Sequence, residues 1–105
     1  MITYEITAEV QPTLADAYER YMRETHIPDL LATGCFVAAS LARSAPGRFR
    51  IRYEARSRAD LDRYFSTHAA ALRADFTAHF PEGVSVAREE WETLARWEET
   101  PARPG

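Results

Sequence analysis

The sequence predicts an α+β protein in which one antiparallel sheet carries two helices on one face. Residues 2–10 and 48–56 alternate apolar and polar side chains, a period that is typical of half-buried strands. Residues 13–25 and 57–80 place apolar side chains three and four residues apart, as amphipathic helices do. With two further strand-like segments, the order is β-α-β-β-α-β, which is the order of the ferredoxin-like fold.

The first strand and the first helix have clear boundaries. The apolar face of residues 2–10 consists of Ile2, Tyr4, Ile6, Ala8 and Val10. Pro12 ends this strand because proline cannot donate to a β-ladder. Pro28 also lacks an amide hydrogen, so we expect the helix to stop or kink near residues 25–27. A short second helix over 29–33, capped by Gly34, should follow.

A β-hairpin is predicted over residues 35–56. Its strands are the apolar segment 35–43 and the alternating segment 48–56. Between them, Pro46 presets the first central position of a type II turn and Gly47 supplies the positive φ of the second.

The second helix is predicted to begin at Ser57, whose hydroxyl can cap the amide of Asp60. Its apolar stripe consists of Leu61, Phe65, His68, Leu72, Phe76 and Phe80. The segment 81–83 breaks it, and a last strand runs from Val84 to about Trp91. We therefore expect one domain over residues 1–93 and a flexible tail over 94–105.

Charge complementarity supports the usual strand order 4-1-3-2 of this fold. That order places the polar face of the first strand, with Glu5 and Glu9, beside Arg48, Arg50 and Arg52 of the third. The helices leave the other face of the sheet uncovered. We expect a second copy to cover it, which would make a homodimeric α/β barrel; a face that is simply solvated is the alternative.

Composition excludes several classes of protein. The 105 residues carry a net charge of −3, which argues against nucleic-acid binding. The longest uncharged run, residues 30–42, is too short to cross a membrane, and no signal-like segment follows Met1. Cys35 is the single cysteine, so no intrachain disulfide can form. These features predict a soluble cytoplasmic protein.

One segment resembles a known family. The stretch Thr-His-Ile-Pro-Asp-Leu-Leu-Ala-Thr-Gly at residues 25–34 is similar to the HIP-[DE]-x-LATG segment of a bacterial family of unknown function, DUF4286. The start of the chain and the pattern of Tyr64, His68 and Phe80 resemble that family as well. The resemblance covers residues 1 to about 93 and weakens after residue 88. It implies a ferredoxin-like protein of the dimeric α/β-barrel type, and it brings no reaction or catalytic residue with it.

His26 is the first candidate for chemistry. It lies beside the expected helix break, where an imidazole that titrates near neutral pH can act as a general acid or base. The alternative is a structural role, in which the ring bonds to backbone freed by the break. A structural His26 should bond to nearby backbone, whereas a functional one should open onto a cavity shared with an aromatic residue of the sheet.

His68 is the second candidate, because its helical stripe faces the sheet. A hydrogen-bonded core histidine is the alternative. His79 lies too far along the helix to share a metal ion with it, and no HxxxH, HxxE or CxxC spacing occurs. We therefore expect no metal site. The four glycines form no dinucleotide or phosphate-binding loop, so we expect no cofactor.

Aromatic and polar side chains supply the remaining candidates. The expected ligand-binding residues are Tyr4, Tyr18, Tyr21 and Arg52, and Tyr53 joins the two histidines as a catalytic candidate. Phenols around a small apolar cavity can orient a planar ligand. Arg52 is a candidate of another kind, because Glu5 with Arg50 or Arg52 could bind a polar ligand between two sheets. The alternatives are that the tyrosines form core and that these charged residues form a structural ion pair.

The sequence thus favours a small homodimeric module that binds a small molecule and has no catalytic signature. The main alternative is a cofactor-independent enzyme, of the cyclase, isomerase or monooxygenase type, with a pocket between sheet and helices. A third hypothesis is an interaction subunit that uses the acidic segment 89–99.

Overall fold

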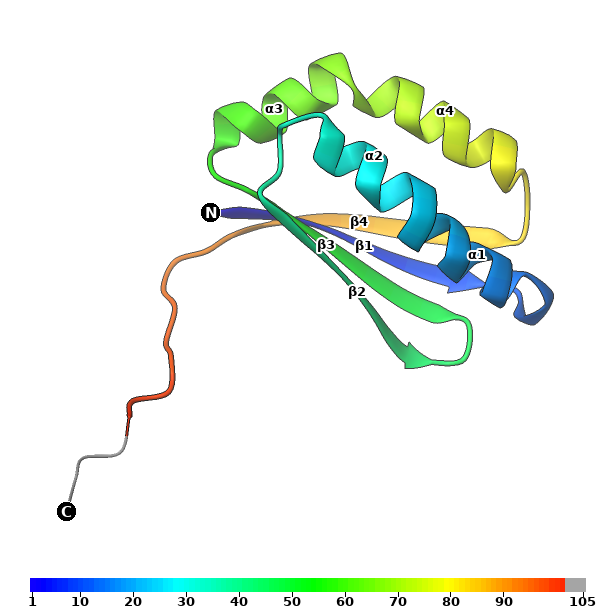
Figure 1. Cartoon of the computed structure of the whole chain (residues 1–105), viewed down its shortest axis with the longest axis horizontal. Helices are drawn as coiled ribbons and strands as arrows, with labels where there is room; N and C mark the ends of the chain where they lie inside the picture. The colour runs from blue at the N-terminus through cyan, green and yellow to red at the C-terminus, as the bar shows by residue number, and fades with distance from the viewer. Residues whose placement is uncertain (102–105) are drawn as a thin grey trace.

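Four strands form an antiparallel sheet, and all helices lie on one face of it (Figure 1). The computed structural model describes residues 1–101. The strands are β1 (Ile2–Val10), β2 (Ala38–Ala45), β3 (Arg48–Ala55) and β4 (Val84–Glu92), in the order β2-β3-β1-β4. This is the predicted order 4-1-3-2 read from the other edge, and the ferredoxin-like fold is confirmed.

The first helical segment runs through Pro28 instead of breaking there. It consists of η1 (Pro12–Leu14), α1 (Ala15–Tyr21), η2 (Met22–His26) and α2 (Ile27–Ala32). The element η2 is a π-helix, in which the amide of Ile27 donates to the carbonyl of Met22, five residues earlier. Pro28 falls in the first turn of α2, where an amide hydrogen is not needed. Of the predicted stop or kink, the stop is therefore wrong, because one wide turn accommodates the proline without ending the helix. The short helix expected after it is present as α2.

The second helical segment is divided where one helix was expected. It consists of α3 (Arg58–Thr67) and α4 (Ala69–His79), with His68 between them at φ −120°. The amide of His68 still donates to the carbonyl of Tyr64 at 2.9 Å. Ala69, with 3% of its surface exposed, brings the start of α4 close to the core, and the apolar spacing did not reveal this bend.

The hairpin begins later than expected. Residues 35–37 precede β2, and the buried Cys35 and Phe36 belong to the core instead of the ladder. The amide of Cys35 donates to the Thr33 hydroxyl at 3.2 Å, and the Phe36 ring packs 4.9 Å from that of Tyr64. The turn has the expected positive φ, 78°, at Gly47.

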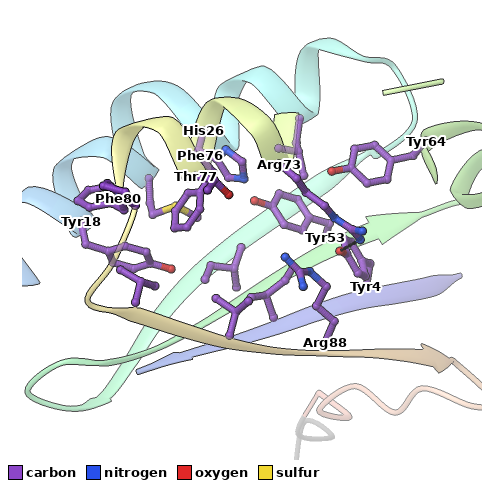
Figure 2. A pocket seen from close by; sticks show the side chains of 17 residues that line it. Tyr4, Tyr18, His26, Tyr53, Tyr64, Arg73, Phe76, Thr77, Phe80 and Arg88 are labelled. Carbon is purple, nitrogen blue, oxygen red and sulfur yellow. Dashed lines mark hydrogen bonds between the residues drawn. The ribbon is translucent and has the colours of Figure 1, made fainter. Parts of the chain in front are cut away.

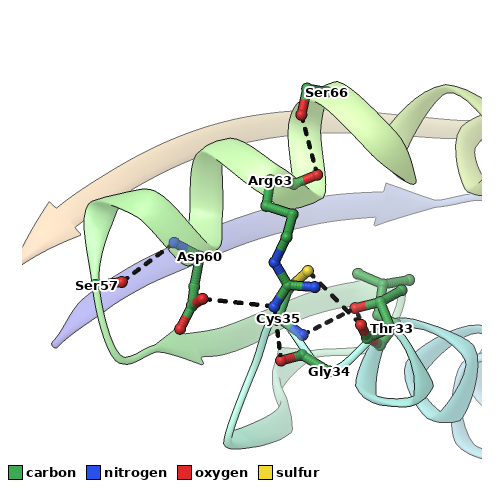
Figure 3. A network of polar contacts seen from close by, with 8 residues as sticks. Thr33, Gly34, Cys35, Ser57, Asp60, Arg63 and Ser66 are labelled. Atoms are coloured by element: carbon green, nitrogen blue, oxygen red, sulfur yellow. Dashed lines mark hydrogen bonds and ion pairs between the residues drawn. The ribbon is translucent and has the colours of Figure 1, made fainter.

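Polar contacts join the end of α2 to the start of α3 (Figure 3). The Ser57 hydroxyl accepts from the amide of Asp60 at 3.2 Å, which confirms the predicted cap. Arg63 of α3 donates to the carbonyl of Gly34 at 3.1 Å and lies 3.5 Å from the Asp60 carboxylate. The contact of Arg63 with Gly34 joins the turn after α2 to α3.

Ion pairs cover the open face of the sheet. Arg52 Nε lies 2.8 Å from Glu5 Oε1, and Arg48 Nε lies 3.4 Å from Glu9 Oε1. The β1–β3 register places these residues directly opposite one another. The predicted cross-strand pairing is therefore present.

The chain leaves the domain after β4, which ends one residue beyond its expected limit. Residues 93–101 form neither helix nor strand and extend away from the sheet (Figure 1). Leu94 and Trp97 in this segment are 89% and 86% exposed. Residues 102–105 of the predicted tail lie outside the described part of the chain, so its flexibility stays a prediction. Within residues 1–101, no helix is both long and apolar enough to cross a membrane.

Candidate functional site

A pocket of about 230 Å³ lies between the helical layer and the sheet (Figure 2). Both helical segments and three of the strands contribute to its walls. Its aromatic and polar lining consists of Tyr4, Tyr18, His26, Tyr53, Tyr64, Arg73, Phe76, Thr77, Phe80 and Arg88. Its aliphatic lining comes from Ile6, Met22, Leu30, Ile51, Val84 and Val86, together with Pro81.

Side chains alternate between the two faces of a strand, and this alternation places Tyr4 and Tyr53 on the face that borders the pocket. Tyr4 of β1 and Tyr53 of β3 are direct cross-strand partners, and their rings stack with centroids 6.1 Å apart. Burial raises the pKa of Tyr53, because the phenolate would lose its hydration. The buried Tyr53 hydroxyl has no hydrogen-bond partner among the described residues. An unpartnered buried hydroxyl is costly, so it is a candidate contact for a ligand.

His26 enters the pocket from the π-helix. Its ring centroid lies 5.4 Å from that of Phe76 and 6.0 Å from that of Tyr21. The side chain makes no capping bond to α2. Burial lowers the pKa of His26, and nearby Arg88 lowers it further, whereas Asp29 and Asp75 act in the opposite direction. The ring is therefore held towards its neutral form, which can accept a proton.

The position of His26 matches one of the two geometries expected for it. No hydrogen bond joins its ring to any residue in the range 1–101, so the expected backbone contact is missing. The ring lines a cavity together with Tyr4 and Tyr53, which are aromatic residues of the sheet. This is the arrangement expected of a functional histidine.

Two arginines at the pocket were missed by the sequence analysis. Arg88 follows Val84 and Val86 on the helix-facing side of β4, so strand parity alone could have placed it there. Arg73 lies three residues before Phe76 on α4, which is a helical spacing. Its guanidinium donates to the Tyr4 hydroxyl at 3.0 Å.

Three of the predicted residues lie elsewhere. His68 is at the bend between α3 and α4 and does not line the pocket. Tyr21 stacks on His79, with ring centroids 4.2 Å apart, outside the lining residues. Arg52 lies on the open face of the sheet, where its hydrogen bond to Glu5 lowers the pKa of that carboxyl group. Of the candidates, the structure thus brings together Tyr4, Tyr18, His26 and Tyr53.

The chemistry available in the pocket is limited. In residues 1–101, no group of three or more His, Cys, Asp or Glu side chains could hold a metal ion. Cys35 is buried and does not line the pocket. What remains is an apolar cavity with one free imidazole, several phenols and two guanidinium groups. Such a lining can bind and orient a small molecule, and it contains one candidate proton acceptor, His26.

The sequence pattern of the family described as Domain of unknown function (DUF4286) matches residues 1–94. The chain belongs to DUF4286. The match spans the whole folded domain, which confirms the resemblance seen in the sequence. No protein of curated function matches this DUF4286 protein.

Several solved structures share the fold. A protein of unknown function from Nitrosomonas europaea has a TM-score of 0.67 and 18% identity, with 95% of each chain covered. A dimeric ferredoxin-like protein from an uncultured marine organism has a TM-score of 0.69 and 6% identity, covering 94% of this chain and all of that one (100%). SnoaB, a cofactor-independent oxygenase from Streptomyces nogalater, has a TM-score of 0.64 and 15% identity, covering 93% of this chain and 97% of that chain. At these identities the likeness of the DUF4286 protein to them extends to the fold alone.

Proposed function

We propose that this DUF4286 protein binds a small molecule in the pocket between sheet and helices. The observation that carries the proposal is a pair of polar groups without hydrogen-bond partners among the described residues, the His26 imidazole and the Tyr53 hydroxyl, beside the apolar walls of the cavity. Groups of this kind destabilise an empty core and are useful to a ligand, because they fix its orientation.

A ligand-observed NMR screen with small aromatic compounds tests this proposal. Binding should be lost in Val86→Phe, because Val86 lines the cavity and a larger ring would fill it. Ala70→Phe is the matched control, since Ala70 is exposed on α4 and does not line the pocket. If Val86→Phe binds the same compounds as the wild type, their site is elsewhere and the proposal fails.

A homodimer that pairs through the open sheet faces is part of the same proposal. Trp91 supports it, because its side chain is 54% exposed on that face and its indole nitrogen lies 3.2 Å from Glu5. The similar fold of a protein described as dimeric is a further support. Sedimentation equilibrium tests it, and a stable monomer at micromolar concentration would rule out the barrel without affecting the pocket.

A cytoplasmic location also belongs to the proposal. The single cysteine, Cys35, is buried and free, which suits a reducing compartment. Fractionation of the native cells tests it, and recovery outside the cytoplasm would contradict it.

His26 favours a second candidate function, a cofactor-independent enzyme. A neutral imidazole inside an apolar pocket can remove a proton from a bound substrate. Tyr53, whose hydroxyl is unpartnered, is the second group placed to act on it. The SnoaB likeness supports the idea only at the level of the fold.

Mass spectrometry of the bound compounds, after aerobic incubation with the protein, tests this candidate. An enzyme should convert at least one of them, and His26→Gln should abolish conversion even of a compound that still binds to the variant. If every bound compound is recovered unchanged, the enzyme hypothesis fails and the binding function remains.

A further inference from the structure

Two guanidinium groups lie at one end of the pocket without a carboxylate partner. Arg73 comes from α4 and its guanidinium reaches the Tyr4 hydroxyl, whereas Arg88 comes from β4 and its side chain extends into the pocket (Figure 2). Neither forms an ion pair with any residue of the part of the chain that is described, although most of the other arginines do. The acidic neighbour of Arg88 along β4, Glu90, pairs with Arg58 instead.

Arg73 is held in a fixed position. It donates to the Tyr4 hydroxyl at 3.0 Å, and its guanidinium carbon lies 5.9 Å from the centre of the Phe65 ring. A guanidinium that is already oriented loses less conformational entropy when it binds an anion. The Tyr4 hydroxyl accepts from only one nitrogen of Arg73, so the other N–H groups of this guanidinium remain able to donate to a ligand.

The rest of the pocket specifies the body of the ligand. Its walls are aliphatic and aromatic, and its volume is about 230 Å³. An apolar cavity of about 150 Å³ accommodates benzene, whereas sites for drug-sized ligands start at about 300 Å³. The pocket volume therefore suits one substituted ring.

The buried Tyr53 hydroxyl adds a second, independent polar feature. It lies on the side of the Tyr53 ring that faces away from Tyr4 (Figure 2), and it has no partner among residues 1–101. A ring hydroxyl placed opposite the charged group of a ligand would satisfy it.

From these features we infer that the ligand is a small aromatic carboxylate of one ring. Its carboxylate accepts hydrogen bonds from Arg73 and Arg88, and its ring lies against the apolar walls. Planar guanidinium groups bind carboxylates with parallel, charge-assisted hydrogen bonds, which explains why two of them border an apolar pocket. The inference rests on the proposed function, because it names the class of molecule bound at the same site.

Isothermal titration with benzoate and benzamide tests the charge requirement. The two probes have nearly the same shape and differ in charge, so the walls alone would bind them equally. We expect benzoate to bind at least about tenfold more tightly, since hydrogen bonds to charged groups are the stronger kind. The probe 4-hydroxybenzoate should bind more tightly than benzoate, and Tyr53→Phe should remove that advantage.

Variants at the arginines assign the contact. Arg88→Gln and Arg73→Gln should each weaken benzoate binding about tenfold or more and weaken benzamide binding much less. Arg20→Gln is the matched control, because Arg20 is an exposed arginine of α1 that does not line the pocket. Arg73→Lys retains the positive charge and should recover part of the affinity. Circular dichroism establishes that each variant is folded, and Arg88, at the surface, can be changed with little effect on folding.

The outcomes separate this inference from the proposed function. Equal binding of benzoate and benzamide, or benzoate affinity unchanged in both arginine variants, overturns the carboxylate class. The same conclusion follows if only neutral compounds from the NMR screen bind in the pocket, and the binding function then stands. If no compound occupies the pocket, both are wrong.

Discussion

Removing one hydroxyl from each of two neighbouring tyrosines should have opposite effects on stability. Tyr4 and Tyr53 are paired across β1 and β3 and are almost fully buried, at 3% and 1% exposure. The Tyr4 hydroxyl accepts a hydrogen bond from Arg73, whereas that of Tyr53 has no partner among the described residues. We therefore compare Tyr4→Phe with Tyr53→Phe, which are the same chemical change in nearly the same surroundings.

The expected magnitudes follow from the contacts. An unmet hydrogen bond at Tyr53 costs about 1–3 kcal/mol, and its removal recovers that free energy. The small void left by the oxygen, about 20 Å³, costs about 0.5 kcal/mol at ~24 cal/mol per Å³. Tyr53→Phe should thus raise the free energy of unfolding by about 0.5–2.5 kcal/mol. Tyr4→Phe should lower it by about 1 kcal/mol, because water can replace only part of the lost bond to Arg73.

Urea denaturation at one fixed protein concentration measures both variants, and the wild type is the reference. The two variants should differ by at least about 1.5 kcal/mol, which corresponds to roughly 6–12 °C in melting temperature for a domain of this size. If Tyr53→Phe lowers the free energy of unfolding by more than about 1 kcal/mol with an unchanged m-value, its hydroxyl has a partner and the reasoning is refuted.

Three further predictions concern the pocket, a cap and a turn. Burial lowers the pKa of His26 in the folded state from 6.5, so the unfolded chain binds a proton more readily and stability is lost as the pH falls below 6.5 through the folded pKa. The melting temperature of the wild type should therefore fall relative to that of His26→Phe between pH 7.5 and pH 5.5, and parallel pH profiles would contradict this. Ser57→Ala removes the cap of α3 and should cost about 0.5–2 kcal/mol in urea denaturation, whereas Ser66→Ala, inside α3, should cost less. Gly47→Ala should cost at least about 1–2 kcal/mol, since φ is +78° and the new Cβ would lie 2.6 Å from the carbonyl oxygen of Val10; an unchanged melting temperature would show that the turn can relax.

Periodicity and the usual order of the fold were enough to predict the sheet. The inward face of β1 was correct because side chains alternate strictly along a strand, so one register places the whole set. The pairing of Glu5 with Arg52 followed from the strand order, because polar faces of neighbouring strands meet at fixed positions. Tyr4 and Tyr53 of the pocket were found by the same alternation.

Local patterns did not predict the bends of the helices. A proline that normally ends a helix is absorbed by the π-turn that carries His26, and this depends on the packing of α1 and α2 on the sheet. At His68, the apolar spacing continued across a bend that the burial of Ala69 requires. His68 was assigned to the pocket on that spacing, and the bend directs it elsewhere.

By itself, the sequence determined the family, the order of elements and the inward set of the strands, because these depend on short-range periodicity and on one specific segment at residues 25–34. Only the tertiary structure decided what the pocket contains. It brings His26 from one helical segment, Arg73 from another and Arg88 from the edge strand β4 to one cavity. The sequence does not predict that these three residues share a cavity, because side chains so far apart along the chain come together only when the helices pack on the sheet. The same packing leaves the Tyr53 hydroxyl without a partner, a property that no local pattern encodes.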